Sequence, residues 1–314
     1  MTQALKGKSL LAWLNKNKKT TNGVLGIETG PEGIALAHVL RTQGQPVQLL
    51  RCVFRPVLPA DQPAELKNMV AEFGLAGMPV NLLLHPALYQ MLLLDCPDVP
   101  ANELRDAMRW KVKEQISEPI EHVLVDAFAL PADAYRGRSR MAYCTVLANT
   151  YVNEWLHMLA HAGLNLQNID ITEMAFRNLG LLAGAEGLNL ALLRLRSSEG
   201  LITVQQGADL YMARRIEQGL TQASGDFAAI TLEIQRSLDY FESQLGKGYI
   251  SRLLLMPMKR DGAQALKALS GGLAVNLQAL NLRDLFVGQA AAEIDEQQQA
   301  YCFSVVGAAL RQEA

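Results

Sequence analysis

One order of apolar runs occurs twice in this chain, and it constrains the fold more than any other feature. Residues 24–29 and 34–40 are apolar runs joined by the turn GPEG, and residues 188–195 and 201–205 are joined by RSSEG. Both patterns are typical of β-hairpins, because glycine and proline favour the turn between two β-rich runs. We therefore expect two halves that share an architecture without sharing a sequence.

The residues after each hairpin predict the same series of elements. A third strand is expected at 46–57 and at 209–216, a helix at 61–73 and at 226–245, and a largely apolar strand at 80–84 and at 250–256. In the first helix Leu66, Met69, Val70 and Phe73 share one face, as an amphipathic helix requires. Further helices are expected near 263–269 and over 293–310.

A different pattern separates the two halves. Strands are expected at 90–94, 123–130 and 140–148, with helices at 102–116 and 151–162. Leu104, Met108 and Val112 recur every fourth residue in the first of these helices, and Gly163 suits the end of the second. This segment predicts a compact α+β module inserted between the halves.

Composition supports a globular chain that is not a nucleic-acid-binding protein. Of 314 residues, 50% are hydrophobic and 19% are charged, and the net charge is -2. The four cysteines (Cys52, Cys96, Cys144 and Cys302) form no CxxC pair, which indicates reduced, buried thiols. No apolar run reaches the ~18 residues of a membrane span, so we expect a cytoplasmic protein. The lysine-rich residues 1–19 either lie on an anionic membrane surface or form a solvated lead-in.

Five segments carry a resemblance to a known family. They are LGIETG at 25–30, the run at 97–116, AGL at 162–164 followed by IDI at 169–171, IQRSLDYFESQ at 234–244, and VGAALR at 306–311. In this order they resemble the PilM family, most closely its MshI branch in the mannose-sensitive haemagglutinin (MSHA) type IV pilus system. The first is similar to the phosphate hairpin of PilM and FtsA. The resemblance covers residues 24–314.

The resemblance implies an α/β, actin-like ATPase fold of two ribonuclease-H-like halves with an inserted small α+β module, as in PilM and FtsA. It implies the boundaries 1–22 for a basic lead-in, 23–88 for the first half, 89–166 for the module, 167–187 for the first half continued, 188–299 for the second half, and 300–314 for a helix returning to the first half. It also implies an adaptor in pilus assembly that holds the cytoplasmic peptide of PilN, a bitopic inner-membrane protein.

The sequence departs from the family at each of three nucleotide motifs. Actin-type hairpins offer amide N–H groups to phosphates and carboxylates to hydrated Mg²⁺. In hairpin one the usual Asp is Glu28 and Gly30 is kept, but Pro31 has no N–H. In hairpin two, Arg194 and Arg196 replace the expected Asp and Gly, and Met256-Pro257 replaces a later Gly pair. We expect no enzyme activity and no ATP or Mg²⁺ cofactor.

Three further hypotheses concern the cleft and the fold. The chain could instead be a weak ATP-binding protein or ATPase that regulates pilus assembly, with Glu28 as the Mg²⁺ ligand. It could self-associate as FtsA does. Glu28 and Arg194 could also meet across the cleft as a charge-assisted pair that holds the halves closed.

Two helices carry further candidate residues. Arg105, Arg109, Trp110 and Lys113 form a basic and aromatic cluster typical of a peptide anchor, and the resemblance implies a peptide groove between the module and the first half. Trp110 could equally be a core residue. His157, His161 and Glu154 have zinc-compatible spacing but no evident fourth ligand, so we expect no metal site. No nucleophile elbow or P-loop is present.

Overall fold

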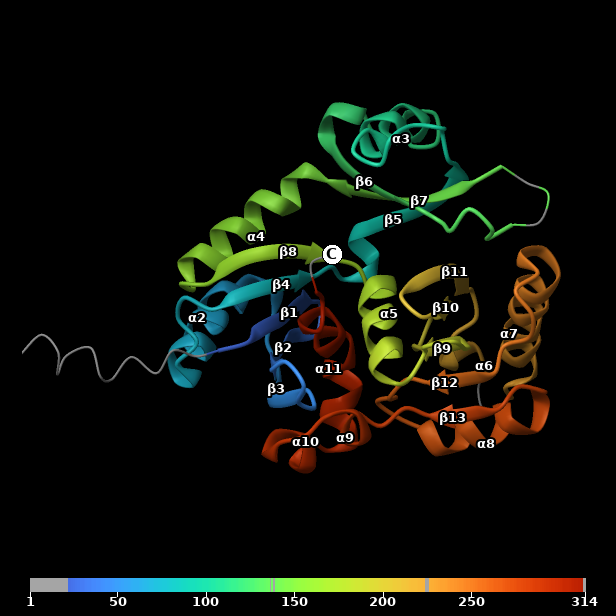
Figure 1. Cartoon of the computed structure of the whole chain (residues 1–314). Coiled ribbons are helices and arrows are strands. Elements are labelled where there is room, and N and C mark those ends of the chain that lie inside the picture. Colours follow the sequence, from blue (N-terminus) through green and yellow to red (C-terminus); the bar gives the residue numbers. More distant parts are fainter. Residues whose placement is uncertain (1–21, 136, 138, 224–225, 313–314) are drawn as a thin grey trace, which may run out of the picture.

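The computed structural model describes residues 22–135, 137, 139–223 and 226–312. Apart from Asn22, the expected lead-in lies outside the described residues. Two five-stranded mixed sheets, one from each half, lie side by side with the inserted module above them (Figure 1). No helix within the described part of the chain has the length and apolar character of a membrane span.

The two sheets repeat one topology, which confirms the duplicated architecture. The orders are β3-β2-β1-β4-β8 and β11-β10-β9-β12-β13, and in each the first three strands are antiparallel and the last two parallel. The first sheet comprises β1 (Val24–Gly30), β2 (Gly33–Leu40), β3 (Gln48–Pro56), β4 (Pro79–Leu83) and β8 (Asn165–Asp170). The second comprises β9 (Asn189–Leu195), β10 (Gly200–Gln206), β11 (Asp209–Ile216), β12 (Arg252–Leu255) and β13 (Leu277–Ala279).

Helices cover both sheets, and the longer ones bury an apolar face. The first half has η2 (Pro59–Asp61), α2 (Gln62–Phe73), η3 (Pro86–Leu88), α4 (Asn149–His161) and α5 (Thr172–Leu182). The second half has α6 (Leu220–Ala223), α7 (Ala228–Tyr240), the π-helical turn η5 (Phe241–Leu245) and α8 (Gly262–Gly272). The chain continues through α9 (Leu282–Leu285) to α10 (Gln289–Glu293), which already packs on β3 of the first half.

The inserted module is a three-stranded sheet, ordered β5-β7-β6, with one helix on its outer face. Its elements are β5 (Tyr89–Asp95), α3 (Leu104–Lys113), η4 (Ile120–His122), β6 (Val123–Ala129) and β7 (Met141–Ala148). Leu104, Met108 and Val112 of α3 are buried against this sheet, as their spacing predicts. Helix α4 instead packs in the core of the first half, so that half resumes at α4 rather than at residue 167.

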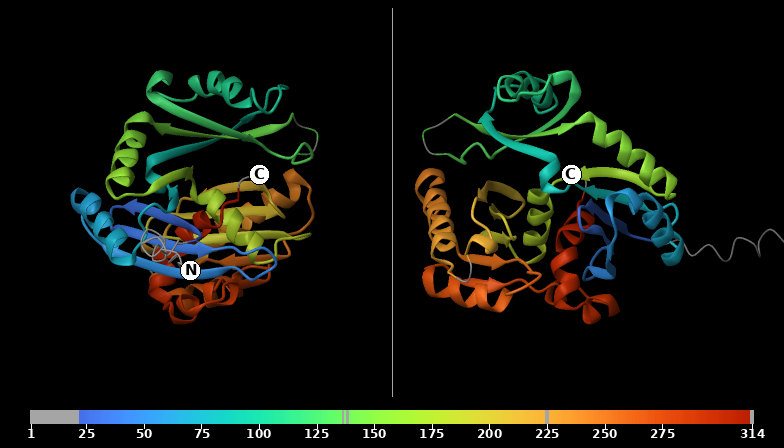
Figure 2. Two further views of the ribbon diagram at one scale, coloured as in Figure 1. Left: turned by 60° about the vertical axis from the view of Figure 1, so that its left-hand side comes forward. Right: turned by 180° about the vertical axis from the view of Figure 1, so that it is seen from behind.

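The last helix, α11 (Glu296–Ala309), returns to the first half and packs on β1, β2 and α5 (Figure 2). Two glycines permit its close approach. A Cβ on Gly26 would lie 1.9 Å from the Val305 carbonyl oxygen, and a Cβ on Gly307 would lie 2.3 Å from the Ala175 carbonyl oxygen. The capping side chain of Asp295, which accepts from the Gln298 amide, starts the helix.

Candidate functional site

The first hairpin places Glu28 in β1 and ends the strand at Gly30. The Gly30 carbonyl accepts a 2.6 Å hydrogen bond from Gln62 Nε2, which holds the turn against α2. Pro31 is exposed at the turn and offers no amide hydrogen there. The next residue, Glu32, forms an ion pair with Lys259, which follows β12 in the second half.

The second hairpin buries Arg194 almost completely. Arg194 is 3% exposed, and its Nη2 donates to Glu199 Oε1 at 2.9 Å, within the same hairpin. Its Nε and Nη1 have no hydrogen-bond partner among the described residues. Burial, followed by the charge of Arg196, lowers the pKa of Arg194. The hypothesis that Arg194 pairs with Glu28 is therefore wrong: the nearer carboxylate, five residues along the chain, takes the bond.

Glu28 makes no ion pair within the described residues, although it lies among cations. Burial raises the pKa of Glu28, while the positive charges of Arg196, Arg194 and Lys259 act in the opposite direction. The cleft has three carboxylates: Glu28, Glu32 and Glu199. Glu32 and Glu199 each pair with a cation, whereas Glu28 has no ion pair in the described part of the chain.

The third motif supplies core packing rather than a ligand cradle. Met256 is 1% exposed and its amide donates to the Leu193 carbonyl at 2.8 Å, which continues the β9–β12 pairing. Pro257 follows it and is partly buried. Lys259, which the sequence reasoning missed, bonds Glu32 and lies 4.2 Å from the Tyr301 ring centroid.

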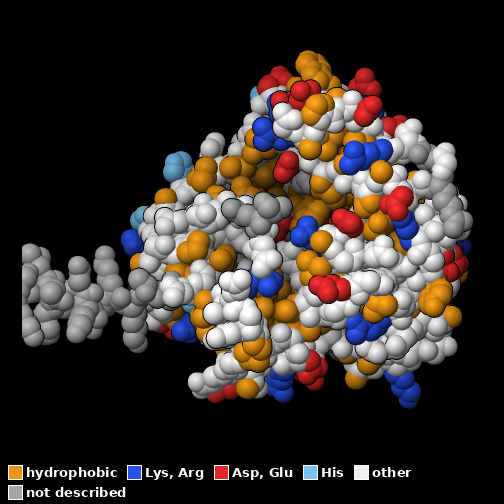
Figure 3. Space-filling view, viewed as in Figure 1, with side chains coloured by type: hydrophobic (Ala, Val, Ile, Leu, Met, Phe, Trp, Pro, Cys, Tyr) orange, Lys and Arg blue, Asp and Glu red, His pale blue; other side chains and the backbone are white. Residues whose placement is uncertain are grey.

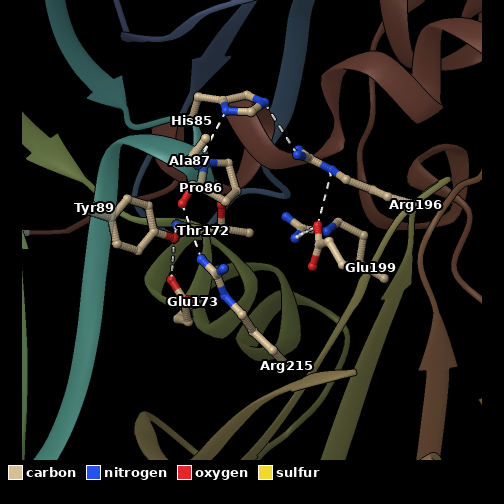
Figure 4. Close-up of polar contacts among 10 residues, drawn as sticks. His85, Pro86, Ala87, Tyr89, Thr172, Glu173, Arg196, Glu199 and Arg215 are labelled. Atoms are coloured by element: carbon tan, nitrogen blue, oxygen red, sulfur yellow. Dashed lines mark hydrogen bonds and ion pairs between the residues drawn. The ribbon is translucent and has the colours of Figure 1, made fainter. Parts of the chain in front are cut away.

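His85 joins the two halves at the second hairpin (Figure 4). Its Nε2 lies 3.3 Å from Arg196 Nη1, and its Nδ1 accepts from the Ala87 amide at 3.3 Å. Burial and the nearby arginines lower the pKa of His85 to about 4, so the ring is neutral at neutral pH. A neutral imidazole accepts at one nitrogen only, so His85 satisfies one of these two donors at a time.

The residues present do not fit Mg-ATP in the actin manner. Arg194 and Arg196 occupy the positions that need a carboxylate and a close backbone approach, and guanidinium groups cannot coordinate Mg²⁺. Two unpartnered nitrogens of Arg194 are buried, not directed at an open phosphate pocket. The arrangement leaves Glu28 as the residue that could contact a cation.

A cavity of about 460 Å³ lies where the inserted module meets the two halves. Figure 3 shows a hollow with hydrophobic side chains beneath the module. The Tyr89 hydroxyl donates to Glu173 Oε2 at 2.6 Å, and Arg215 Nη2 donates to the Pro86 carbonyl at 3.2 Å (Figure 4). The cavity is lined by Pro86, Ala87, Tyr89, Gln90, Met91, Glu173, Leu201, Ala213 and Arg215.

Sequence reasoning did not identify this cavity, because its walls come from distant segments. The module also packs on the second half beside it: Leu130, Ala134 and Tyr143 join the second core, and the Ala213 amide donates to the Tyr143 hydroxyl at 2.9 Å. The inserted module therefore contacts both halves.

The predicted peptide-binding cluster on α3 lies away from this cavity. Leu92 and Val146 face α3, whereas Met91 and Tyr143 face the halves, because alternate residues of a strand point to opposite sides. Arg105 and Lys113 are exposed on α3, and Arg109 donates to the Val123 carbonyl at 3.3 Å and to that of Ile120. Trp110 is 73% exposed, so it is not a core residue. The cluster does not lie between the module and the first half, and its binding of a peptide stays a prediction.

Comparisons with known proteins support the fold. No protein-family model matches the sequence, and no curated protein matches it. A chain of the PilM–PilN type IV pilus biogenesis complex is similar in structure, with a TM-score of 0.69 and 20% identity, over 91% of this chain and 97% of that one. A Bacteroides thetaiotaomicron protein of actin-like ATPase fold and unknown function has a TM-score of 0.53 and 11% identity, over 87% and 95%. This chain therefore has the actin-like fold, with an inserted small antiparallel module.

Proposed function

We propose that this chain is a non-catalytic cytoplasmic adaptor of type IV pilus biogenesis, of the MSHA kind. It binds the cytoplasmic peptide of a PilN-like inner-membrane protein, and through that partner it is held at the inner membrane. The observation that carries the proposal is the cavity of about 460 Å³, which is of the size typical of ligand sites. The likeness of fold to a chain of the PilM–PilN complex supports the choice of partner.

The state of the nucleotide cleft supports a protein-binding rather than a catalytic role. Two of its three carboxylates are paired with cations: Arg194 bonds Glu199, and Lys259 bonds Glu32. Phosphoryl transfer depends on metal ligands and on backbone donors aimed at the phosphates. We infer that the cleft holds the halves together without performing chemistry.

A titration with a synthetic peptide tests the adaptor. The probe carries the cytoplasmic N-terminal residues of the PilN-like protein from the same organism, and binding is measured by calorimetry. Ala87→Trp fills the cavity from an exposed wall position and should weaken binding at least tenfold. Ala71→Trp, at an exposed position on α2, is the matched control and should leave it unchanged. Equal binding by both variants would reject the cavity as the site.

The alternative, a weak ATP-binding protein, rests on Glu28, which lacks an ion pair in the described part of the chain. Thermal unfolding with and without Mg-ATP separates the two functions, because a ligand at 100 times its Kd adds about 2.7 kcal/mol of stability. The adaptor proposal expects no shift. A shift that Arg194→Glu abolishes would favour nucleotide binding.

A further inference from the structure

The outer side of helix α3 carries a large aromatic residue that the described part of the chain leaves exposed. The buried residues of α3 face the module sheet, so the opposite side of the helix faces solvent, at the end of the molecule away from the two halves (Figure 1). Trp110 lies on that side and is 73% exposed. Because tryptophan is highly buried in most folds and is enriched at protein interfaces, this position suits an interface anchor.

Two opposite charges flank Trp110 on the same side of the helix. Asp106 precedes it by four residues and Lys113 follows it by three, so the three side chains form one stripe. Asp106 and Lys113 are about 10.5 Å apart along the helix axis, which is too far for an ion pair within one helix. The Asp106 side chain is 82% exposed and its Oδ1 lies 4.0 Å from Arg105 Nε, a contact that contributes little stability.

The order of these three residues is self-complementary under a two-fold rotation. When two copies of a helix pack antiparallel about a two-fold axis, each contact between unlike residues occurs twice. The midpoint between Asp106 and Lys113 lies between residues 109 and 110, next to the tryptophan. Each Asp106 would therefore face Lys113 of the other copy, and the two Trp110 rings would meet near the axis.

We propose that this side of α3 binds a second copy of this chain as an antiparallel, two-fold symmetric helix pair. Stacked indole rings form its centre, and two ion pairs between Asp106 and Lys113 set its register. The helix has only 10 residues, so the pair buries less than the about 800 Å² per partner of a standard interface. The dimer is therefore weak and depends on protein concentration.

The charges on the stripe favour a second copy over a partner of one sign. An acidic segment is repelled by Asp106 and a basic segment by Lys113, whereas the same stripe reversed in direction matches both. The arrangement also leaves the cavity of about 460 Å³ uncovered, because Met91 and the other residues that line it lie on the opposite side of the module sheet from α3. Self-association goes beyond the proposed function and does not depend on it.

Sedimentation equilibrium over a range of protein concentrations tests the interface. The unmodified chain should show a reversible equilibrium between monomer and dimer, and Trp110→Ala should raise the dimer Kd at least tenfold. Tyr249→Ala is the matched control, because Tyr249 is 75% exposed in the second half, and it should leave the Kd unchanged. An unmodified chain that stays monomeric at every concentration, or a dimer that Trp110→Ala does not weaken, would overturn the proposal.

Charge reversal tests the antiparallel register. Asp106→Lys and Lys113→Asp each place like charges opposite one another twice, so each variant alone should dimerise at least tenfold more weakly. In an equimolar mixture the two lysines of one variant face the two aspartates of the other, and a heterodimer should form. The double variant Asp106→Lys/Lys113→Asp should regain the original Kd for the same reason. Weakening that neither mixing nor the double variant reverses would reject this register.

The outcomes for this surface and for the adaptor function are separate. Calorimetry with the synthetic peptide described above should give the same affinity for Trp110→Ala and for both charge reversals, because α3 lies away from the cavity. Loss of the dimer with unchanged peptide binding supports a distinct surface. A loss of peptide binding in these variants would contradict that separation.

Discussion

The buried pair Arg194–Glu199 allows a quantitative test of the cleft. Arg194 is 3% exposed and keeps one carboxylate partner at 2.9 Å, while its other two guanidinium nitrogens have no partner in the part of the chain that the structure describes. Removing one partner of a buried ion pair costs about 3–5 kcal/mol, because the other charge stays buried alone. The Glu199 side chain is 26% exposed, so water screens part of this bond, and we expect Glu199→Gln to cost about 2–3 kcal/mol.

Replacing the arginine should have a different effect. Arg194→Met keeps an unbranched side chain against Phe176, whose ring centroid lies 5.9 Å from the guanidinium carbon, and removes the buried charge. Exchanging a buried ionic group for a well-packed apolar one is often neutral or stabilising by about 1–4 kcal/mol. We expect the free energy of unfolding of Arg194→Met to equal or exceed that of the unchanged protein.

Urea unfolding followed by circular dichroism measures both variants and their combination. Glu199→Gln alone should lower the free energy of unfolding by about 2–3 kcal/mol. In the Arg194→Met background the same change should lower it by almost nothing, because the interaction between residues 194 and 199 is then already absent. The exposed pair Arg55–Glu72, at 2.7 Å, is the control, and Glu72→Gln should cost less than about 1 kcal/mol. A loss above about 2 kcal/mol in Arg194→Met, or an equal cost of Glu199→Gln in both backgrounds, would refute the reasoning.

Three further tests use residues outside this pair. The pKa of His85 is about 4 in the fold against 6.5 unfolded, so between these values the unfolded chain binds more protons and stability falls as pH falls. After allowance for partial exposure the loss is about 1–2 kcal/mol, and His85→Asn should flatten the pH profile of the melting temperature. Gly26→Ala should lower the free energy of unfolding by at least about 2 kcal/mol, because its Cβ would lie 1.9 Å from the Val305 carbonyl oxygen. Gly271→Ala, with open space around it, should raise that free energy by about 0.5 kcal/mol, and urea unfolding measures both changes. Trp110→Ala, at a 73% exposed position, should change stability by less than about 0.5 kcal/mol, and Trp155→Ala, at an 8% exposed one, should cost about 3–5 kcal/mol; equal costs would contradict the burial.

Elements with one clear apolar period could be predicted from the sequence. The stripe Leu66, Met69 and Val70 in α2 and the fourfold spacing in α3 both face a core, so periodicity reports packing directly. Strand β8 and helix α5 were not predicted. β8 reads NLQNID and lies at a sheet edge, and α5 buries Glu173 and Asn178 as well as apolar residues, so neither shows a simple pattern.

The site was harder to predict than the fold, because its contacts join distant segments. The departures from the motifs of the family that the sequence resembles are visible at Pro31, Arg194 and Arg196, since each changes a chemical group at a defined position in the sequence. The partner of Arg194 is not, because the turn geometry brings Glu199 closer than Glu28. The contact of His85 with Arg196, 111 positions apart, has no sequence signal in one chain.

The return of α11 to the first sheet affects how this chain can be made. Residues 296–309 are translated after all of the second half, yet they cover Ala35, Ala37 and Val39 of β2. A nascent chain therefore exposes this apolar face until the ribosome has finished the second half. The half that begins first is completed last, so any fragment ending before residue 296 leaves that face open to aggregation or to chaperones.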